Sequence, residues 1–245
     1  MAYDHLRSVI KRLHPVDSGH SLIRVGHDGD GGYLIPDALE GIKYCFSPGV
    51  SGYTALEDQM VQRGMECFLL DGSMDCPDFK YPAGIHFQKK WLKQYDSHDS
   101  LSLATWIRES IGDYTGDLFM QMDIEGYEYE TLGTMPDELL DQFRILVVEF
   151  HNLYLLQNGT WLNVFERLCN FFHVVHIHPN NFNLPDSHTH CEELVIPPVL
   201  EFTFMNKRSF SPWFDPAHVT SFPHPLDADN NPFHPHEVLH SCWYR

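Results

Sequence analysis

The sequence predicts an α/β fold in which a mostly parallel sheet is wound by crossover helices. Three observations support this prediction. Short apolar runs recur along the chain, and stretches with apolar residues at helical spacing separate them. Glycine, proline and acidic residues stand where the runs end. Strands that alternate with helices of about 10–15 residues are typical of parallel sheets, because each connection must cross a face of the sheet.

The expected elements follow one another in a regular order. Apolar residues at helical spacing open the chain and predict a helix that ends before Pro15. The expected strands, all short and apolar, cover residues 44–46, 67–71, 85–87, 118–123, 145–150, 172–178 and 199–204. The expected helices between them cover residues 54–63, 100–110, 127–132 and 161–171.

One domain accounts for the whole chain, residues 1–245, because this length is about one and a half times a typical domain of ~150 residues. Residues 1–40 hold the first helix and a glycine-rich segment, which we expect to form a lid or part of a binding pocket. Residues 41–208 form the α/β core. Residues 209–245 are rich in proline, histidine, aspartate and asparagine and are expected to form a loop-rich tail.

Charge and composition exclude several classes of function. The net charge of −18 argues against sequence-independent binding to DNA or RNA and against docking on an anionic membrane. The apolar runs are far shorter than the ~20 residues that span a bilayer, and no secretory signal is visible. The six cysteines lie far apart without a CxxC pair, which favours reduced thiols. We therefore expect a soluble cytoplasmic protein with neither nucleic-acid nor membrane partners.

The first strand leads into a glycine-containing loop that is a candidate ligand site. Gly49, Ser51 and Gly52 lie between this strand and the next helix, where glycine lets the backbone approach a ligand and the helix offers free N–H groups. Asp71 ends the next strand, the position at which nucleotide-binding α/β folds hold ribose hydroxyls with an acid. The absence of GxGxxG argues against NAD. A tight turn and a strand-end cap are the structural alternatives for these residues.

Carboxylates and histidines end three further strands. Asp123 and Glu125 lie on the same side of the chain if the extended geometry continues past residue 122, and such a pair can hold a substrate, a metal or a cofactor amine. Helix capping is the alternative. Glu149 and His151 end the next strand, and His176 and His178 end the one after it. These residue types predict an acid/base or metal site, which Asp123 could join, although no HExxH spacing indicates zinc.

Taken in order, these motifs resemble the FkbM-like S-adenosylmethionine-dependent methyltransferases, which have a Rossmann-like class I fold. The resemblance runs from about Arg24 to Arg208. The motifs that support it are Asp30-Gly31-Gly32-Tyr33, Gly49-Val50-Ser51-Gly52 with Glu57 after it, Asp71, Met122-Asp123-Ile124-Glu125-Gly126, Glu149-Phe150-His151, His176–Asn181 and Val199–Thr203. The segment Met122–Gly126 resembles the hallmark of the family.

The resemblance implies a mostly parallel seven-stranded sheet with helices on both faces and an antiparallel last strand. The resemblance places the methionine part of the cofactor by Gly49 and Gly52, with Ser51 a further cofactor-binding residue of the same loop, and the ribose by Asp71. It places the methyl-transfer region near Asp123, Glu125 and His151, and Asp123 and Glu125 are counted among the cofactor-binding residues. This sequence has Ser47 where the family commonly has an acid, and its glycine loop is reduced to GxxG. Glu57 is the candidate that supplies the missing carboxylate.

The resemblance further implies an O-methyltransferase that acts on a hydroxyl of a sugar, a glycan precursor or another polar small molecule. His151 or His178 is the candidate base, with Glu149 orienting it and Asp123 close to the transferred group. Alternatively, carboxylates hold Mg²⁺ or Mn²⁺, which binds the acceptor and lowers its pKa. The sequence does not identify the residues that would bind this metal ion. Two other functions remain as alternatives: a metal-dependent hydrolase that uses the same cluster, and a non-catalytic cofactor-binding protein.

Overall fold

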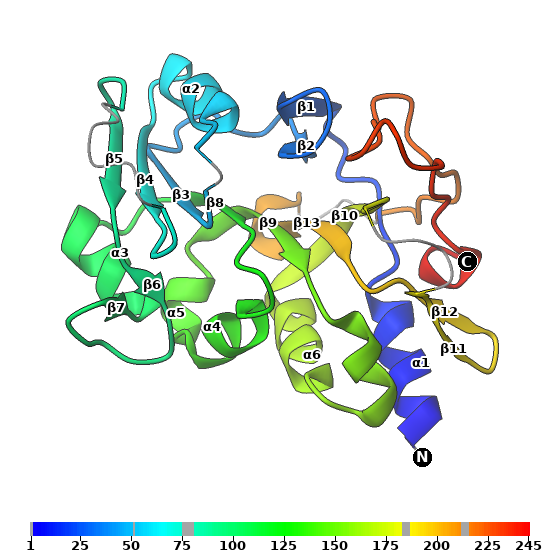
Figure 1. Ribbon diagram of the computed structural model, residues 1–245. Coiled ribbons are helices and arrows are strands. Elements are labelled where there is room, and N and C mark those ends of the chain that lie inside the picture. The colour runs from blue at the N-terminus through cyan, green and yellow to red at the C-terminus, as the bar shows by residue number, and fades with distance from the viewer. Residues whose placement is uncertain (1, 51, 75–80, 183–186, 212–215) are drawn as a thin grey trace.

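A seven-stranded sheet organises the computed structural model, which describes residues 2–50, 52–74, 81–182, 187–211 and 216–245 (Figure 1). From one edge to the other, the strands are β10 (Phe172–Pro179), β13 (Leu200–Asn206), β9 (Phe143–Phe150), β8 (Leu118–Met122), β3 (Tyr44–Pro48), β4 (Glu66–Leu70) and β5 (Ile85–Gln88). The predicted α/β class is therefore confirmed. Each of the seven expected strands is present, with bounds shifted by a few residues.

The sheet is parallel except at β13. This strand is the last of the seven in the chain, and it runs antiparallel to both of its neighbours, β9 and β10. The pairs β3–β4, β3–β8, β4–β5 and β8–β9 are parallel. The expected mostly parallel sheet with an antiparallel last strand is thus confirmed.

The strand order reverses between β3 and β8. After β3 the chain adds β4 and β5 on one side, and it then crosses back to add β8 and β9 on the other side. In open α/β sheets, ligands bind beyond the carboxyl ends of the strands at such a point, because the two flanking loops diverge there and leave a crevice. The loops that follow β3 and β8 begin at Gly49 and Asp123, which the sequence analysis selected.

Side chains alternate between the two faces of the sheet along each strand, so apolar side chains point to both faces. Other elements cover each face. On one face, α1 (Ala2–Arg12), α3 (Leu103–Ile111), α4 (Glu128–Thr134) and α6 (Leu162–Phe171) contribute to the larger core. On the other face lie α2 (Ala55–Gln62) and a hairpin of β1 (Leu22–Gly26) and β2 (Gly32–Pro36) (Figure 1). Helices therefore lie on both faces, but a β-hairpin covers much of the second one.

The hairpin and several short elements were not predicted. The glycine-rich segment is the loop of the β1–β2 hairpin, and Arg24 holds it by donating to the carbonyl oxygens of His27 (3.0 Å) and Gly29 (2.9 Å). The helix expected from residue 100 begins at Leu103, because Ser102 caps it by accepting a hydrogen bond from the Thr105 N–H. The other short elements are β6 (Trp91–Leu92), β7 (Ser100–Leu101), α5 (Asp137–Leu140), η1 (Leu153–Asn158), β11 (Thr189–Cys191), β12 (Leu194–Ile196), η3 (Lys207–Ser209) and η4 (Ser241–Trp243).

The described part of the tail is mostly irregular, as expected, and it packs on the β10 side of the molecule (Figure 1). The fully buried Trp243 anchors its end and donates from Nε1 to the carbonyl oxygen of Val195 at 2.9 Å. In the part of the chain that the structure describes, no helix has the length and apolar character needed to cross a membrane.

Candidate functional site

A cavity of about 910 Å³ opens beyond the carboxyl ends of β3, β4 and β8. Five of the predicted cofactor-binding residues lie in its wall: Gly49, Glu57, Asp71, Asp123 and Glu125. Gly52 lies near the start of α2 and is not among the lining residues, and Ser51 lies outside the described residues. The β1–β2 hairpin contributes Asp30, Gly31 and Tyr33 to the same wall.

Only glycine fits at the turn after β3. Gly49 has φ +82°, and a Cβ atom there would lie 1.5 Å from the carbonyl oxygen of Asp123. Its N–H donates to the carbonyl oxygen of Leu70 at 3.0 Å, and the N–H of Asp123 donates to that of Pro48 at 3.3 Å. The loops after β3 and β8 therefore touch through their backbones at the base of the cavity.

Asp71 joins the loops that follow β3 and β4. Its Oδ2 accepts from the N–H of Val50 at 3.0 Å. Its Oδ1 accepts from the N–H and hydroxyl of Ser73, both at 2.6 Å, and from the N–H of Met74 at 3.2 Å. The strand-end cap considered from the sequence is thus present. The same carboxylate faces the cavity, where it can also accept from a ligand.

A buried polar chain crosses the floor of the cavity beneath α2. The hydroxyl of Ser47 has two acceptors in reach, Oε1 of Glu57 at 2.5 Å and Oε1 of Gln121 at 2.9 Å. The amide of Gln121 donates to the hydroxyl of Tyr33 at 3.0 Å. Burial raises the pKa of Glu57, and the bond from Ser47 opposes this shift. Oε2 of Glu57 is buried without a hydrogen-bond partner among the described residues.

Asp123 carries the most perturbed carboxylate of the cavity wall. Burial raises its pKa to about 7; the charge of His151 opposes this shift, and the charges of Glu125 and Glu128 add to it. Its Oδ1 has no hydrogen-bond partner in the described part of the chain, although Nε2 of His151 lies 3.8 Å away. β8 ends at Met122 and Glu125 has φ +55°, so the extended geometry assumed for this pair does not continue.

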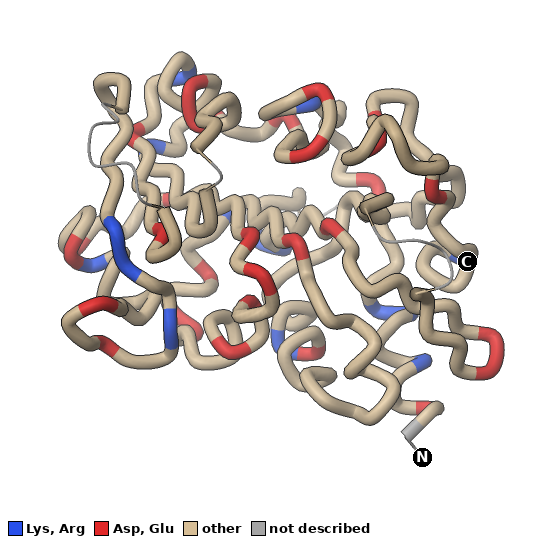
Figure 2. Tube along the Cα trace, viewed as in Figure 1, with Lys and Arg blue, Asp and Glu red and all other residues tan. Residues whose placement is uncertain are grey.

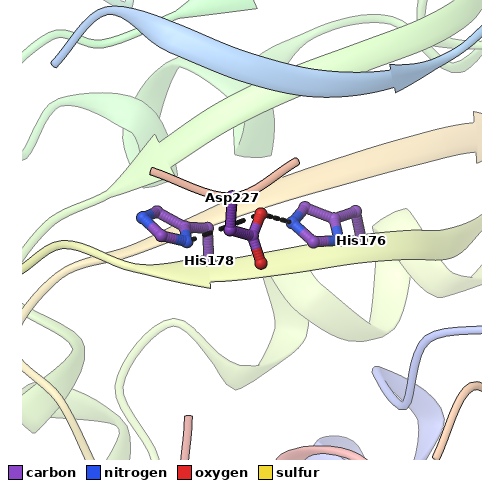
Figure 3. A group of neighbouring side chains, drawn as sticks. All are labelled: His176, His178 and Asp227. Atoms are coloured by element: carbon purple, nitrogen blue, oxygen red, sulfur yellow. Dashed lines mark hydrogen bonds and ion pairs between the residues drawn. The ribbon is translucent and has the colours of Figure 1, made fainter. Parts of the chain in front are cut away.

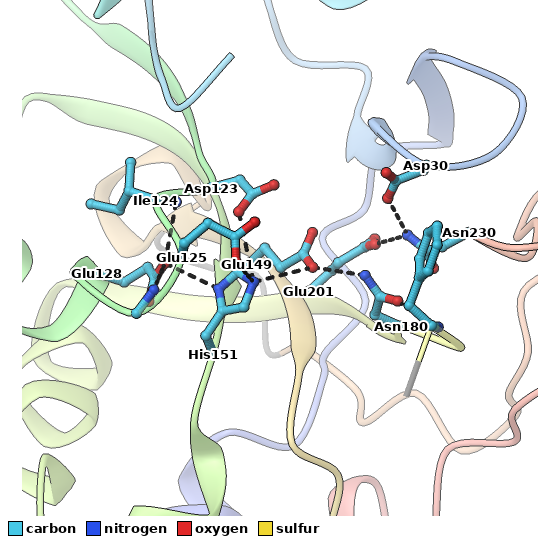
Figure 4. Close-up of polar contacts among 12 residues, drawn as sticks. Asp30, Asp123, Ile124, Glu125, Glu128, Glu149, His151, Asn180, Glu201 and Asn230 are labelled. Atoms are coloured by element: carbon cyan, nitrogen blue, oxygen red, sulfur yellow. Dashed lines mark hydrogen bonds and ion pairs between the residues drawn. The ribbon is translucent and has the colours of Figure 1, made fainter. Parts of the chain in front are cut away.

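His151 lies close to Asp123 and is surrounded by carboxylates (Figure 4). Its Nδ1 is 3.2 Å from Oε1 of Glu128. Its Nε2 is 3.4 Å from Oε2 of Glu125 and 3.8 Å from Oε1 of Glu149. Burial disfavours the charged ring, but the hydrogen bond to Glu128 and the surrounding carboxylates outweigh it and raise the pKa of His151. The carboxylate nearest to the ring is therefore that of Glu128, which the sequence analysis did not select, and not that of Glu149.

Glu128 also shapes the turn after β8. Its side chain is fully buried, and Oε1 accepts from the N–H groups of Ile124 (3.2 Å) and Gly126 (3.0 Å). The sequence contained one signal for this role. An acid in the first turn of a predicted helix, directly after a glycine turn, can accept hydrogen bonds from free N–H groups.

A second acidic group lies beyond His151, along β9 and β13 (Figure 4). Glu149 and Glu201 are paired directly across these antiparallel strands, and burial raises the pKa of both. Asn180 donates to Oε1 of Glu149 at 2.7 Å. Asn230, in the tail, donates to Oε1 of Glu201 at 2.6 Å and to Oδ1 of Asp30 at 3.2 Å. The tail is thereby tied to the hairpin loop at the cavity.

His178, the second candidate base, belongs to a different cluster (Figure 3). It lies beside His176 on β10, and both rings face Asp227 of the tail. The structure therefore brings His151, Glu149 and Asp123 together and places His178 in a separate cluster. Of these four candidate catalytic residues, Asp123 lines the cavity and the other three are not among its lining residues.

The charged residues in the wall of the cavity are mostly acidic. Figure 2 shows Asp and Glu in the β1–β2 loop and in the turn after β8. The acidic lining residues are Asp30, Glu57, Asp71, Asp123 and Glu125. Lys90 is the single Lys or Arg among the lining residues that the structure describes. A ligand with positive charge is therefore favoured. Among the described residues, two groups of side chains could hold a metal ion, because the ligand atoms within each group lie within 4.8 Å of one another. These groups are Asp123–Glu125–His151 and His176–His178–Asp227.

Comparison with known proteins does not assign a function to this site. No protein-family model matches the sequence, and no curated protein matches it.

Proposed function

We propose that this protein is an S-adenosylmethionine-dependent O-methyltransferase of the Rossmann-like class I fold, acting on a hydroxyl of a sugar or another polar small molecule. One observation carries the proposal. A cavity whose charged wall residues are mostly acidic lies at the point where the strand order reverses, and its base is the contact of Gly49 with the carbonyl of Asp123. The antiparallel β13 agrees with the fold that the sequence resemblance implies.

The residues of the cavity fit this cofactor. S-adenosylmethionine supplies a methyl group on a positively charged sulfonium, and it also carries an ammonium group. Two buried carboxylate oxygens in the cavity-lining residues, Oε2 of Glu57 and Oδ1 of Asp123, have no hydrogen-bond partner among the described residues. Such oxygens gain a charge-assisted partner when a cation binds. In this proposal Glu57 and the Gly49 turn hold the methionine part, and Asp71 holds the ribose.

His151 is the base in this proposal. A neutral ring that donates its Nδ1 proton to Glu128 leaves Nε2 as the acceptor, on the side of Asp123 and Glu125. The acceptor hydroxyl would pass its proton to Nε2 while its oxygen takes the methyl group from the sulfonium. The electron pair of the broken S–C bond would stay on sulfur, so that S-adenosylhomocysteine leaves as a neutral thioether. Asp123 and Glu125 orient the reactants, and in-line positioning supplies much of the rate. The acceptor enters from the side of the hairpin loop, where Asp30 lines the cavity.

Calorimetric titration with S-adenosylhomocysteine, with and without Mg²⁺ or Mn²⁺, tests the proposal. We expect one site per chain, and binding that is lost in Gly49→Ala. A tighter complex in the presence of the cation would favour cation-assisted transfer. Absence of binding under all of these conditions would refute the methyltransferase. Once an acceptor is found among sugars and polar natural products, His151→Ala should abolish turnover while cofactor binding persists.

The Asp123–Glu125–His151 group supports a second candidate, a metal-dependent hydrolase. These three residues offer two carboxylates and an imidazole within 4.8 Å, a donor set that can hold a divalent cation and activate water. A hydrolase of this kind would lose activity on chelation and would not bind S-adenosylhomocysteine. The titration above therefore separates the two functions.

A further inference from the structure

We propose that His176, His178 and Asp227 form a binding site for a zinc-class transition-metal ion, separate from the cavity, which fastens the C-terminal tail to β10. The two histidines stand two residues apart on the strand, so their side chains share one face of the sheet. Asp227 approaches them from the tail and lies between the two rings (Figure 3). None of the three lines the cavity.

The distances suit a shared ion. Oδ1 of Asp227 is 2.8 Å from Nε2 of His176 and 3.7 Å from Nδ1 of His178, and all three ligand atoms lie within 4.8 Å of one another. Two ligands of a tetrahedral zinc ion, each at about 2.1 Å, are about 3.4 Å apart. Small movements of the side chains would therefore bring the three atoms into coordination range.

His178 provides independent support for a ligand. Its side chain is only 8% exposed, and neither ring nitrogen has a hydrogen-bond partner among the residues that the structure describes. A buried imidazole without hydrogen bonds is costly, because it has given up those that it made to water. A metal ion would take the lone pair of Nδ1, the atom that faces Asp227.

Neighbouring contacts hold the other two ligands in place. Oδ2 of Asp227 accepts from the N–H of His224 at 2.7 Å, which turns Oδ1 toward the histidines. The ring of His176 stacks on Phe222, with centroids 5.8 Å apart. Contacts of this kind orient metal ligands and limit the reorganisation on binding. The structure thus presents a preformed set of two nitrogens and one oxygen.

This donor set selects the class of ion. Two imidazoles and one carboxylate suit Zn²⁺ and its first-row neighbours, whereas Mg²⁺ and Ca²⁺ prefer all-oxygen sites. Three protein ligands leave a fourth position for water. Asp227 lies three residues before Asn230, which bonds to Glu201 and to Asp30 of the hairpin loop. An ion on Asp227 would therefore also restrain the tail where it borders the cavity.

Metal binding to the full-length chain tests the site. After chelation and dialysis, the protein is titrated with Zn²⁺ by calorimetry and with Co²⁺ by visible absorption. We expect one tight site per chain and the intense absorption of tetrahedral Co²⁺. Asp227→Asn preserves the shape of the side chain and should weaken binding at least about 100-fold and abolish the Co²⁺ spectrum. Bound Zn²⁺ should also slow proteolysis of residues 216–245 in the wild-type protein but not in this variant.

Glu125→Gln is the matched control, because it alters the other group of potential ligands and should leave the tight site unchanged. Circular dichroism and thermal unfolding in chelator establish that each variant is folded, and His178→Gln replaces Asp227→Asn if the latter is not. The proposal is overturned if the wild-type chain binds no stoichiometric Zn²⁺. It is equally overturned if a folded Asp227 or His178 variant keeps the affinity and the spectrum.

Discussion

The carboxylate of Glu128 and the ring of His151 form a buried pair at the carboxyl edge of the sheet. Nδ1 of His151 lies 3.2 Å from Oε1 of Glu128, and the glutamate side chain is fully buried. The same oxygen accepts two backbone N–H groups of the turn that carries Asp123 and Glu125. One carboxylate therefore fixes both the orientation of the ring and the position of the acids that face it.

We expect Glu128→Gln to lower the pKa of His151. Burial alone would lower this pKa, and the hydrogen bond to Glu128 together with the surrounding carboxylates raises it above the usual value of about 6.5. Removal of the nearest negative charge should lower it, because the charged form of the ring then loses its closest partner. Nuclear magnetic resonance titration of the His151 ring measures the shift without an acceptor. Glu130→Gln, on the same helix, should leave the value unchanged.

The pair of Glu128 and His151 makes both the stability of the fold and the expected turnover depend on pH. A raised histidine pKa stabilises the fold fully below about pH 6.5, and this contribution is lost as the pH rises through the folded pKa. If His151 is the base, turnover rises with pH over the same range, because only the neutral ring accepts a proton. In Glu128→Gln the acid limb should move to lower pH. An acid limb that does not move in this variant would contradict the positioning role of Glu128.

We expect Gly49→Ala to destabilise the protein by about 3 kcal/mol or more and to abolish binding of S-adenosylhomocysteine. The added Cβ would lie 1.5 Å from the carbonyl oxygen of Asp123, so the loops after β3 and β8 would have to separate. Gly41→Ala is the matched control. Gly41 has φ +79°, but a Cβ atom added there would meet no atom of the described residues within 4 Å. Its substitution should therefore cost only the strain of placing alanine in the left-handed conformation, about 1 kcal/mol. Chemical denaturation and calorimetry check both variants, and equal losses would show that the contact is unimportant.

The regular part of the fold could be predicted from the sequence because burial on both faces makes the core strands continuous apolar runs. Phe119 and Met120, for example, are both fully buried, on opposite faces of β8. The glycine loop and the acids after the strands were predicted to meet, since the carboxyl ends of parallel strands share one edge. The β1–β2 hairpin was missed, although two short apolar runs flanking a loop with Asp-Gly pairs are typical of a hairpin.

The contacts of the tail could not be predicted in the same way. Asp227 meets His176 across 51 positions of sequence, and Asn230 meets Asp30 across 200. Such pairs depend on where an irregular segment packs, and no periodicity encodes that. The role of Glu128 is intermediate. Its place in the first turn of α4 was visible, but its contact with His151 required the register of β8 and β9.

We expect Asp123→Asn to stabilise the protein at pH 8 and to have no effect on stability at pH 3.5. Burial raises the pKa of Asp123 to about 7, so its ionised form costs stability as the pH rises from about 4 to 7. A shift of about 3 units corresponds to about 4 kcal/mol. We expect a gain of about 1–2 kcal/mol, because the side chain is 31% exposed and water in the cavity screens its charge.

Asp117→Asn is the control of opposite sign. Burial would raise the pKa of Asp117, but Arg208 and Arg144 outweigh it and lower the pKa, so the ionised form stabilises the fold above about pH 4. The free energy of unfolding of this variant should be about 1–3 kcal/mol lower than that of the wild-type protein at pH 8, and the difference should be smaller at low pH. Urea unfolding at the two pH values measures both differences. A loss in Asp123→Asn at pH 8 would show that its charge has a compensating partner.

We expect Glu57→Gln to weaken the binding of S-adenosylhomocysteine about 10- to 100-fold. Oε2 of Glu57 is buried in the chain without a hydrogen-bond partner among the described residues, and the residue lines the cavity. If this oxygen receives the ammonium group of the cofactor, the substitution removes a charge-assisted hydrogen bond of about 1.5–3 kcal/mol. Ser47 can still bond to the amide oxygen of the new side chain, so the fold should persist.

Asp58→Asn is the matched control for this test. Asp58 follows Glu57 on α2, but its Oδ2 accepts from the hydroxyl of Thr54 at 3.2 Å and it does not line the cavity. Its substitution should change the affinity for S-adenosylhomocysteine less than about twofold, since water screens a partly exposed charge outside the cavity. Equal affinities of the two variants for S-adenosylhomocysteine would show that Glu57 does not contact the cofactor. The methionine part of the cofactor would then have to rely on the backbone of the Gly49 turn alone.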